Sequence, residues 1–590
     1  MNGPAIAGDS PDGPGGRADV LSGRSASLVI LACLFCGLFS GGLRDQVLAA
    51  PVLACVGLAV LLGPRLERAA LAPWLPFLGW AVLSLLASPQ PLTGLALLAR
   101  WTGGAVFFSA AASLWTEARR RLWFWALAGC GLVLAAASFL VDVPGYPKVG
   151  ILPLYYNYTC FVQAALFCAV LPAVLRPDGP RGLRRAGLAA LAACALAQIL
   201  WAHSRGACVA VAAGAGVFAW RHAPRRRFTA WTLALALGLG ATLLLATWAK
   251  ISVASGFKRP QIWKAAILCA ADRPVFGVGP GQFANAFLRH NFPAGYDVGN
   301  FRFQTEHAHS EVMELAVELG VPGILLLLTA LGMCLRPGRV QDSTWTREAG
   351  LAAFAGMSAQ CLIDNLLHLP ALELLYVSAL AAAWTPRPDG EPAARSAGRG
   401  LALAVIILAA VSWVPDRLLK GWQEAAARDA DPARRLESIL RCVRLAPADP
   451  YLRENLAGAW LAQNPPQPDE AMRQLALAQE LSPTNAVYPA MRAQMLERQE
   501  AWPQALAAAD RAVALEPDYF QARLLRAEAL LRLERRPEAQ AELAEVCRRG
   551  QVLGARLNTG VGYMRYLLGF DRARYEGLSR RTGMVCRPRL

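Results

Sequence analysis

Lysine is scarce in this chain although the chain is basic. Only five of its 59 Lys and Arg residues are lysine, and with 42 Asp and Glu the net charge is +17. Arginine bias also follows from genomic base composition, so we predict no nucleic-acid binding from it. Charged residues are only 17% of the chain, hydrophobic residues 55%, and the mean hydropathy is +0.33. At 590 residues the chain is too long for one compact domain, and its composition indicates a membrane protein.

The cysteines lack the spacing of a disulfide or metal motif. Eleven of the 14 lie between Cys33 and Cys361, mostly within apolar runs, where cysteine behaves as a small hydrophobic residue. The remaining three, Cys442, Cys547 and Cys586, follow no ligand spacing. We therefore expect neither a disulfide framework nor a zinc site.

Apolar runs fill most of residues 25–415. Residues 1–24 are rich in Gly, Pro, Asp and Ser, which predicts a disordered cytoplasmic tail. The first apolar run, 25–43, has no small-residue cleavage site, so it predicts a retained span rather than a signal peptide. A bilayer-crossing helix needs about 20 apolar residues, and on that scale we predict about thirteen transmembrane helices. The further runs lie at 46–63, 71–88, 94–115, 122–141, 158–175, 186–202, 206–220, 229–249, 311–335, 347–366, 371–385 and 400–415.

Arginine marks every second short connection between these runs. If the N-terminus is cytoplasmic, the positive-inside rule is satisfied at each short turn. The expectation is then a multi-pass membrane protein, with the 250–310 loop and everything after Val414 on the extracytoplasmic side. The cytoplasmic arginines are Arg65, Arg68, Arg119–Arg121, Arg176, Arg181, Arg184, Arg185, Arg221, Arg225–Arg227, Arg336, Arg339, Arg347, Arg387, Arg395 and Arg399.

Residues 416–552 have a different composition, rich in Ala, Leu, Arg, Glu and Gln, and a repeat of 34 residues. Two sets of alanines and a pair of prolines recur at this step: Ala459, Ala493 and Ala527; Ala471, Ala505 and Ala539; Pro483 and Pro517. The period resembles tetratricopeptide repeats, in which small residues let paired helices pack. We predict about three repeats, with 553–590 as a cap. Such arrays bind partners, here a possible protein partner, although an inert spacer is the alternative. The predicted fold class is therefore all-α, a polytopic membrane protein followed by a soluble helical-repeat domain.

Residues 257–323 gather Arg, Lys, His, Glu, Asn and Gly between long apolar blocks. They contain Arg259-x-x-x-Trp263, then a glycine turn within 274–283, then His309-Ser310-x-x-x-Glu314-x-x-x-Glu318-Leu319-Gly320. With Ser204-Arg205-Gly206 upstream, most of residues 25–385 resembles the O-antigen ligase and polymerase family. One departure is Ser310, because the family more often has Asn after this histidine.

The resemblance implies a site that takes a glycan from undecaprenyl diphosphate, without cofactor or metal. His309 matches the family's general base, and an imidazole that titrates near neutrality can accept a proton from a hydroxyl. Arg205 and Arg259 match diphosphate-binding positions, for which a guanidinium offers a fork of donors. On spacing alone, interfacial snorkelling explains these arginines equally well. His307 is the weaker candidate, and its i, i+2 spacing from His309 is poor for binding one metal.

The remaining candidates have a supporting role or none. Glu314 and Glu318 lie one helical turn apart and support the Arg or His side chains or face water. Arg100 and Asp364 lie within or near the end of apolar runs, where site, pairing and snorkelling roles are all open. Asn157 resembles an asparagine that the family often has before the matching span. The turn Gly277–Gly281 lacks a strand–turn–helix context, so we expect a close backbone approach to the donor rather than a dinucleotide site.

The acceptor is left open. It is lipid A-core, a protein Ser/Thr hydroxyl or another glycan, so the chain is a ligase, a protein O-oligosaccharyltransferase or a polymerase, respectively. A transporter is the alternative of another class, although the two halves show no internal repeat. A third possibility is an assembly scaffold anchored by the spans. Membrane lipids complete the expected partners.

Overall fold

The computed structural model describes residues 21–39, 46–141, 156–202, 204–222, 258–295, 298–335, 344–385, 392–558 and 563–584. These residues form helices, and their only β-structure is two isolated bridges, Glu67 with Pro392 and Pro293 with Arg302. The all-α prediction is therefore confirmed. The tail at 1–20, the run predicted at 229–249 and Arg225–Arg227 lie outside the described residues.

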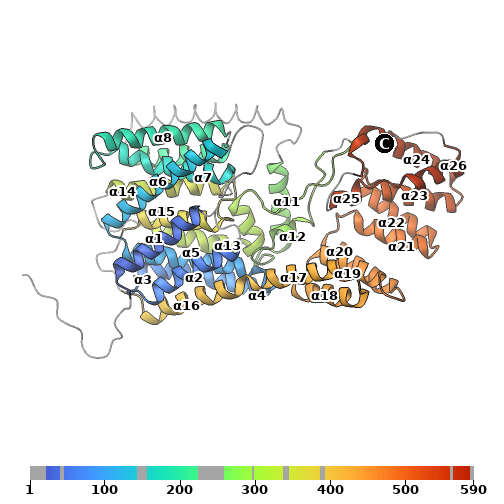
Figure 1. Ribbon diagram of the computed structural model, residues 1–590, viewed down its shortest axis with the longest axis horizontal. Coiled ribbons are helices and arrows are strands. Elements are labelled where there is room, and N and C mark those ends of the chain that lie inside the picture. The colour runs from blue at the N-terminus through green and yellow to red at the C-terminus, as the bar shows by residue number, and fades with distance from the viewer. Residues whose placement is uncertain are drawn as a thin grey trace, which may run out of the picture.

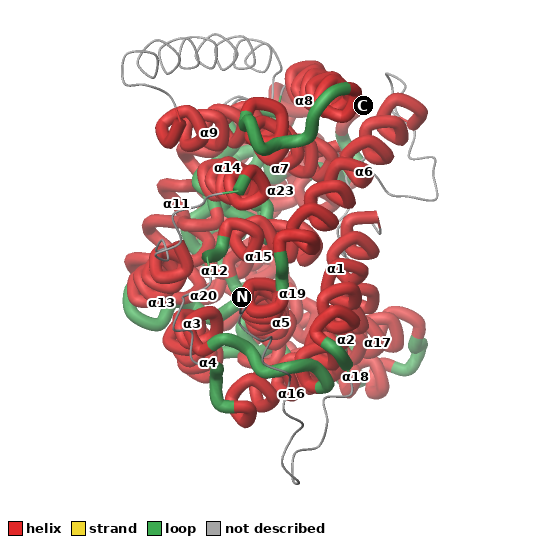
Figure 2. Tube along the Cα trace, turned by 90° about the vertical axis from the view of Figure 1, so that its left-hand side faces the viewer, coloured by secondary structure: helices red, strands yellow, loops and turns green. Residues whose placement is uncertain are grey.

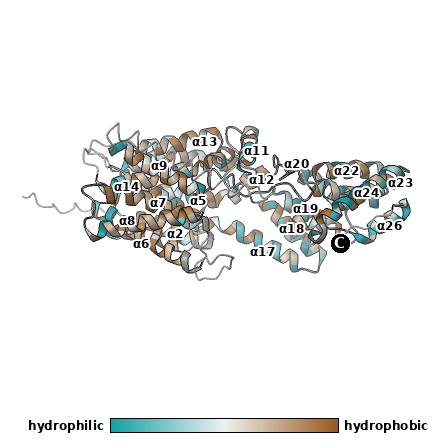
Figure 3. Ribbon diagram, turned by 90° about the horizontal axis from the view of Figure 1, so that it is seen from above, coloured by the Kyte–Doolittle hydropathy of each residue, from teal (hydrophilic) through white to brown (hydrophobic). Residues whose placement is uncertain are grey.

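Two groups of helices lie side by side along the long axis (Figure 1). The first group is apolar and the second alternates polar and apolar residues (Figure 3). The first comprises α1 Gly23–Phe39, α2 Gln46–Leu61, α3 Arg68–Leu71, α4 Leu75–Ala87, α5 Leu95–Leu114, α6 Glu117–Val141, α7 Tyr156–Leu175, α8 Leu183–Trp201, α9 Arg205–His222, α11 Arg259–Asp272, α12 Phe283–Phe287, α13 Glu311–Leu335, α14 Trp345–Cys361, α15 Pro370–Ala383 and α16 Arg395–Ser412, with 3-10 turns η1 Ala72–Trp74 and η2 Pro91–Gly94.

Seven described helices are long and apolar enough to cross a membrane. Three shorter apolar helices lie at Gly23–Leu38, Ala49–Leu61 and Pro370–Ala383. The predicted count of about thirteen is not confirmed, because α14, for example, has only 17 residues. Figure 2 looks along this bundle, in which α14 packs on α7, α9 and α15, and α16 packs on α2 and α5.

Helix α13 is interrupted at Gly320, whose φ of 69° breaks the helical path. The interruption frees backbone groups, and neighbouring elements satisfy them. Val321 N–H donates to Pro274 O at 2.9 Å, and the indole N–H of Trp80 donates to Leu319 O at 2.9 Å. Within a membrane protein such compensation is what makes a broken helix tolerable. The first turns of α13 are thus set apart from the apolar remainder.

The second group consists of paired helices that follow the 34-residue period. Their recurring alanines are buried, with Ala471 and Ala539 at 0% exposure and Ala505 at 3%. The helices are α17 Val414–Arg428, α18 Pro432–Leu445, α19 Pro450–Leu461, α20 Pro468–Leu481, α21 Val487–Arg498, α22 Trp502–Leu515, α23 Phe520–Arg532, α24 Arg536–Leu553, η3 Gly554–Arg556, α25 Tyr563–Leu567 and α26 Arg572–Thr582. Each pair, such as α19 with α20 and α21 with α22, packs together and then on the next.

One cysteine departs from the expectation. Cys547 on α24 is disulfide-bonded, and its partner lies outside the described residues. The other described cysteines are free. Sequence spacing did not reveal this bond, because a single long-range pair forms no motif.

Candidate functional site

Helix α11 carries two motif residues on one face. Arg259 opens the helix and Trp263 follows one turn later, so both side chains point the same way. Arg259 Nη2 donates to Asp364 Oδ1 at 2.7 Å and Nη1 donates to Ile363 O at 2.6 Å. The indole of Trp263 donates to Ala308 O at 3.1 Å. The two residues therefore hold different parts of the chain, the segment after α14 and the segment that carries His309.

The Ser204-Arg205-Gly206 motif begins α9 and meets the same aspartate. A β-carbon on Gly206 would lie 2.1 Å from Asp364 Oδ2, so only glycine lets this carboxylate approach the helix. Arg205 is close enough to Arg259 and Asp364 for both charges to act on its guanidinium. The structure thus brings the two predicted arginines together around Asp364, from elements far apart in the sequence.

His309 lies in the left-handed region, with φ of 52°, just before α13. Non-glycine residues rarely adopt this conformation, and where they do the surrounding structure holds them there. Burial, together with the positive charges of Arg259 and His307, lowers the pKa of His309 to about 4, against the opposing effect of Glu314. The ring is therefore neutral near pH 7, the form that a general base requires.

Glu314 organises the backbone around this histidine. Its Oε1 lies 3.0 Å from His307 Nδ1, and its Oε2 accepts the Ala308 N–H at 2.9 Å and the Asn365 side-chain N–H at 2.6 Å. The carboxylate is only 14% exposed, so it does not simply face water. His307 is consequently anchored, which fits a supporting role better than a proton-transfer role.

Ser310 accounts for the departure from the family pattern. Its hydroxyl accepts the Met313 N–H at 3.4 Å, three residues into the helix. This is the contact of a helix N-cap, and serine and asparagine are about equally good there. The substitution therefore keeps the start of α13 capped directly after His309.

The glycine turn packs against Glu318 and the backbone of α13. Glu318 is 3% exposed and accepts the Phe283 N–H at 3.3 Å. A β-carbon on Gly277 would lie 2.3 Å from the Glu318 backbone, and Ser88 on the chain segment after α4 donates to Val278 O at 3.0 Å. The close approach that the glycines allow is thus to α13 and its neighbours. A close approach of this turn to the donor stays a prediction.

Arg100 reaches the site region from α5. Its Nε lies 3.3 Å from Glu373 Oε2, and its Nη2 donates to Leu367 O. The Leu367 N–H in turn donates to Glu311 Oε1 at 2.6 Å. Arg100 is therefore paired and supports the segment that follows α14. Asn157 lies in the first turn of α7, and its side chain is outside the described residues, so its role stays a prediction.

The segment 363–368, between α14 and α15, takes part in the contacts of Arg100, Arg259 and Glu314, and sequence reasoning found only part of it. Asp364 was a candidate, whereas Asn365 and His368 had no predicted site role. The His368 ring lies 4.8 Å from the His307 ring, between centroids, at 42°. The signal was present as Asp-Asn-x-x-His between two apolar runs. Among the described residues, no group of three or more His, Cys, Asp or Glu is arranged to hold a metal ion.

Comparison with known proteins addresses part of the chain. Residues 190–328 match the family model described as O-Antigen ligase. This stretch is an O-antigen ligase domain. It contains Arg205, Arg259, His307 and His309, whereas Asp364 lies beyond it. The O-antigen ligase domain and the long apolar helices together make the chain a membrane protein with a glycosyltransferase-like function.

No curated protein matches the chain. Among solved structures, the crystal structure of MamA protein is 16% identical, with 28% of this chain and 88% of that chain covered and a TM-score of 0.22. The crystal structure of the APC/C hetero-tetramer Cut9–Hcn1 is 13% identical, with 95% and 90% covered and a TM-score of 0.23. Both TM-scores are too low to support a statement about this fold, so the repeats are described from their own helix pairs.

Proposed function

We propose that the chain moves a glycan from undecaprenyl diphosphate to an acceptor hydroxyl on the periplasmic side of the inner membrane. The observation that carries this proposal is the meeting of Arg205, Arg259 and Asp364 beside a neutral His309. Base and cationic groups from separate elements converge at the edge of an apolar bundle, where ionisable residues are costly and functional.

The chemistry follows from these groups. His309 takes the proton from the acceptor hydroxyl, and its oxygen attacks the anomeric carbon with inversion. The bond from that carbon to the diphosphate breaks, and its electron pair stays on the diphosphate oxygen. Arg205 and Arg259 stabilise the growing negative charge. Arginine has five N–H donors, and the Arg259 contacts to Asp364 and Ile363 leave others for phosphate oxygens. The proposal includes neither metal nor nucleotide.

The arrangement of the helices supports a periplasmic site and repeat domain. Helices α11 and α12 lie at the end of the bundle that faces the repeats (Figure 1). The disulfide at Cys547 is of a kind that persists in oxidising compartments such as the periplasm. The proposal therefore includes four parts of the chain: a cytoplasmic tail at 1–24, a membrane domain at 25–415 with its loop at 250–310, repeats at 416–552 and a cap at 553–590.

The acceptor is proposed as a large one, lipid A-core or a protein, because the repeats stand next to the site. A polymerase of the same family, with a glycan acceptor, is the alternative. Purified chain in lipid vesicles, given a labelled undecaprenyl-diphosphate glycan and each acceptor in turn, tests both. Label should move to an acceptor and leave the lipid. Solute flux with no transfer would instead support a transporter.

A further inference from the structure

The chain between α12 and α13 leaves the bundle and lies against the repeats. We call residues 288–295 and 298–304 the bridging segment. Thr484 Oγ1 donates to Leu288 O at 2.7 Å, and Arg289 Nη1 donates to Glu480 O at 3.2 Å. Further along, the Gly299 N–H donates to Asp518 Oδ2 at 2.7 Å. The segment is therefore hydrogen-bonded at both ends to the repeats.

The contacts on the repeats recur at the repeat period. Ser482 and Thr484 both donate to Leu288 O, and 34 residues later Glu516 and Asp518 accept the Arg302 and Gly299 N–H groups. Both pairs flank the proline of a turn between successive helix pairs. One edge of the array, built from equivalent turns, thus holds the bridging segment.

Apolar packing reinforces these hydrogen bonds. Phe301 is 6% exposed and belongs to the buried core of the repeats, with Tyr488 and Phe520. Gly299 has φ of 92°, and a β-carbon there would lie 2.9 Å from Arg556 Nη1 and 3.0 Å from Leu553 Cδ2. A larger residue at 299 would be strained at this φ and would have to displace the Arg556 and Leu553 side chains.

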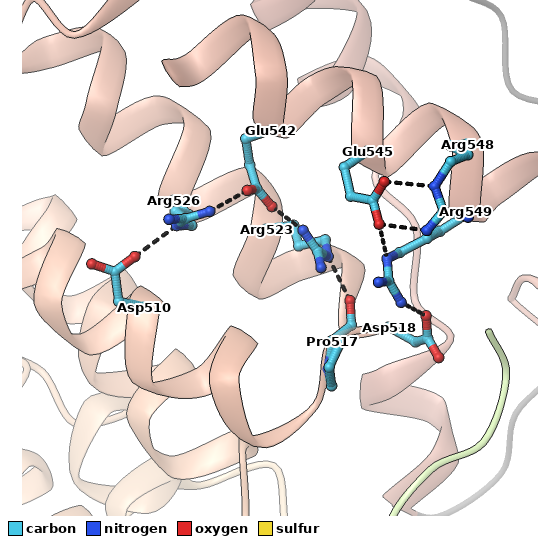
Figure 4. A network of polar contacts seen from close by, with 9 residues as sticks. All are labelled: Asp510, Pro517, Asp518, Arg523, Arg526, Glu542, Glu545, Arg548 and Arg549. Atoms are coloured by element: carbon cyan, nitrogen blue, oxygen red, sulfur yellow. Dashed lines mark hydrogen bonds and ion pairs between the residues drawn. The ribbon is translucent and has the colours of Figure 1, made fainter. Parts of the chain in front are cut away.

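The turn Glu516–Asp518, which accepts the N–H groups of the bridging segment, is itself held in place by its neighbours. Arg549 binds the other oxygen of Asp518, and Arg523 donates to Pro517 O and binds Glu542 (Figure 4). Glu516 and Asp518 are 1% and 4% exposed. Their oxygens are therefore placed by the repeats before the segment adds its N–H groups, and placement in advance lowers the entropy cost of holding a loop.

The bridging segment leads directly to the predicted base. The side chain of Tyr451 on α19 lies close enough to that of Gln304 for the two to interact. Next, the Thr305 hydroxyl donates to His307 O at 2.8 Å. We infer that the repeats position the segment His307–His309, with Phe301, Glu516 and Asp518 as positioning residues, so that the array is part of the catalytic apparatus. This inference rests on the proposed function.

Two substitutions test it in the full-length protein. Phe301→Ala removes the apolar anchor, and Gly299→Ala strains the docked backbone, whose φ at 299 is 92°, and crowds the Arg556 and Leu553 side chains. Each should speed hydrogen exchange of the bridging-segment amides while the α21–α23 amides stay protected. Each should lower single-turnover glycan transfer by about ten- to a hundredfold, as small misplacements of reacting groups do. Donor affinity should change less than about twofold, since positioning alters the rate rather than donor binding.

Matched variants separate positioning from general damage. Phe301→Leu keeps an apolar side chain and should restore most of the rate. Glu424→Gln on α17, at a 62% exposed side chain far from the segment in sequence, should leave the rate unchanged. Faster exchange with an unchanged transfer rate would overturn the inference, as would unchanged exchange. A wild-type protein that transfers no glycan would instead overturn the proposed function, while the exchange data still report whether the repeats hold the segment.

Discussion

Asp364 accepts a hydrogen bond from Arg259 at 2.7 Å through one oxygen and places the other against the Cα of Gly206. The motifs that contain Gly206 and Arg259 lie more than fifty residues apart in the sequence, yet both contact the carboxylate of Asp364. Asp364 itself lies outside the stretch that matches the O-antigen ligase model. Asp364 therefore constrains both the Arg259 side chain and the start of α9, and a substitution at Gly206 tests this arrangement directly.

Gly206→Ala should displace Asp364, because the new methyl group would lie 2.1 Å from its Oδ2. The Arg259 guanidinium would lose its orientation, and transfer should fall about tenfold or more, on the scale of small misplacements. Gly216→Ala on the same helix is the control, since nothing lies within 4 Å of its added carbon. Equal rates for both variants, measured in vesicles at matched protein amounts, would remove Gly206 from the site.

Arg205→Lys and Arg259→Lys should each reduce transfer steeply at normal membrane levels. Lysine keeps the charge but loses the planar fork that matches phosphate, and at Arg259 it cannot reach both Ile363 O and Asp364 in the same way. Arg428→Lys, at a 79% exposed side chain, is the control. Normal activity in both site variants would show that general electrostatics suffices.

His309→Ala should abolish transfer while donor binding persists, because the arginines hold the diphosphate. Loss of a general base costs about a hundred- to ten-thousandfold in rate. His307→Ala should be milder, since that ring is anchored on Glu314. A chelator should have no effect. Single-turnover assays of the purified variants decide this, and an equally severe loss in His307→Ala would mean that His307 is the base.

The pH dependence should report a shifted histidine. With its pKa lowered to about 4, His309 is largely neutral above about pH 5 and becomes protonated as the pH falls through 4. The value of kcat/KM should therefore stay level between about pH 5 and 8 and fall toward pH 4, without a limb near 6.5. His307→Ala removes one positive charge that lowers this pKa, so its acidic limb should move to higher pH. An acidic limb near 6.5 in the wild type would contradict the burial of this ring.

Membrane orientation can be tested by reporter fusions. A reporter after Arg395 should read as cytoplasmic and one after Arg580 as periplasmic, because the arginine-rich turns satisfy the positive-inside rule only in that orientation. A cytoplasmic reading after Arg580 would place the repeats on the other side and change the parity of the span count.

Much of the fold could be predicted from the sequence because its signals are periodic. Long apolar runs and a 34-residue repeat are local patterns, and the buried alanines, such as Ala493 at 1% exposure, follow the repeat directly. The approximate span count was harder, since helices such as α14 are only 17 residues long. For the site, the motifs gave Arg205, Arg259 and His309, which the structure places in one region.

The missed parts depend on contacts between distant segments. The role of His368 requires knowing that the segment after α14 packs on His307. The docking of Phe301 into the repeats has no local pattern either, since a lone aromatic residue in a loop indicates nothing by itself. The packing of the glycine turn on Glu318 and Ser88 could not be predicted for the same reason, because both residues are remote from it in the chain.

The last membrane helix does not stop at the bundle. Helices α16 and α17 are separated only by Trp413, which is itself in a helical conformation, so one nearly continuous rod of residues 395–428 enters the repeats. A body attached to a single rod is free to swing about it. Here the bridging segment supplies a second attachment, and the bundle, the rod, the repeats and the segment close a ring. With two attachments instead of one, the repeats have fewer ways to rotate relative to the bundle than a body held by α17 alone.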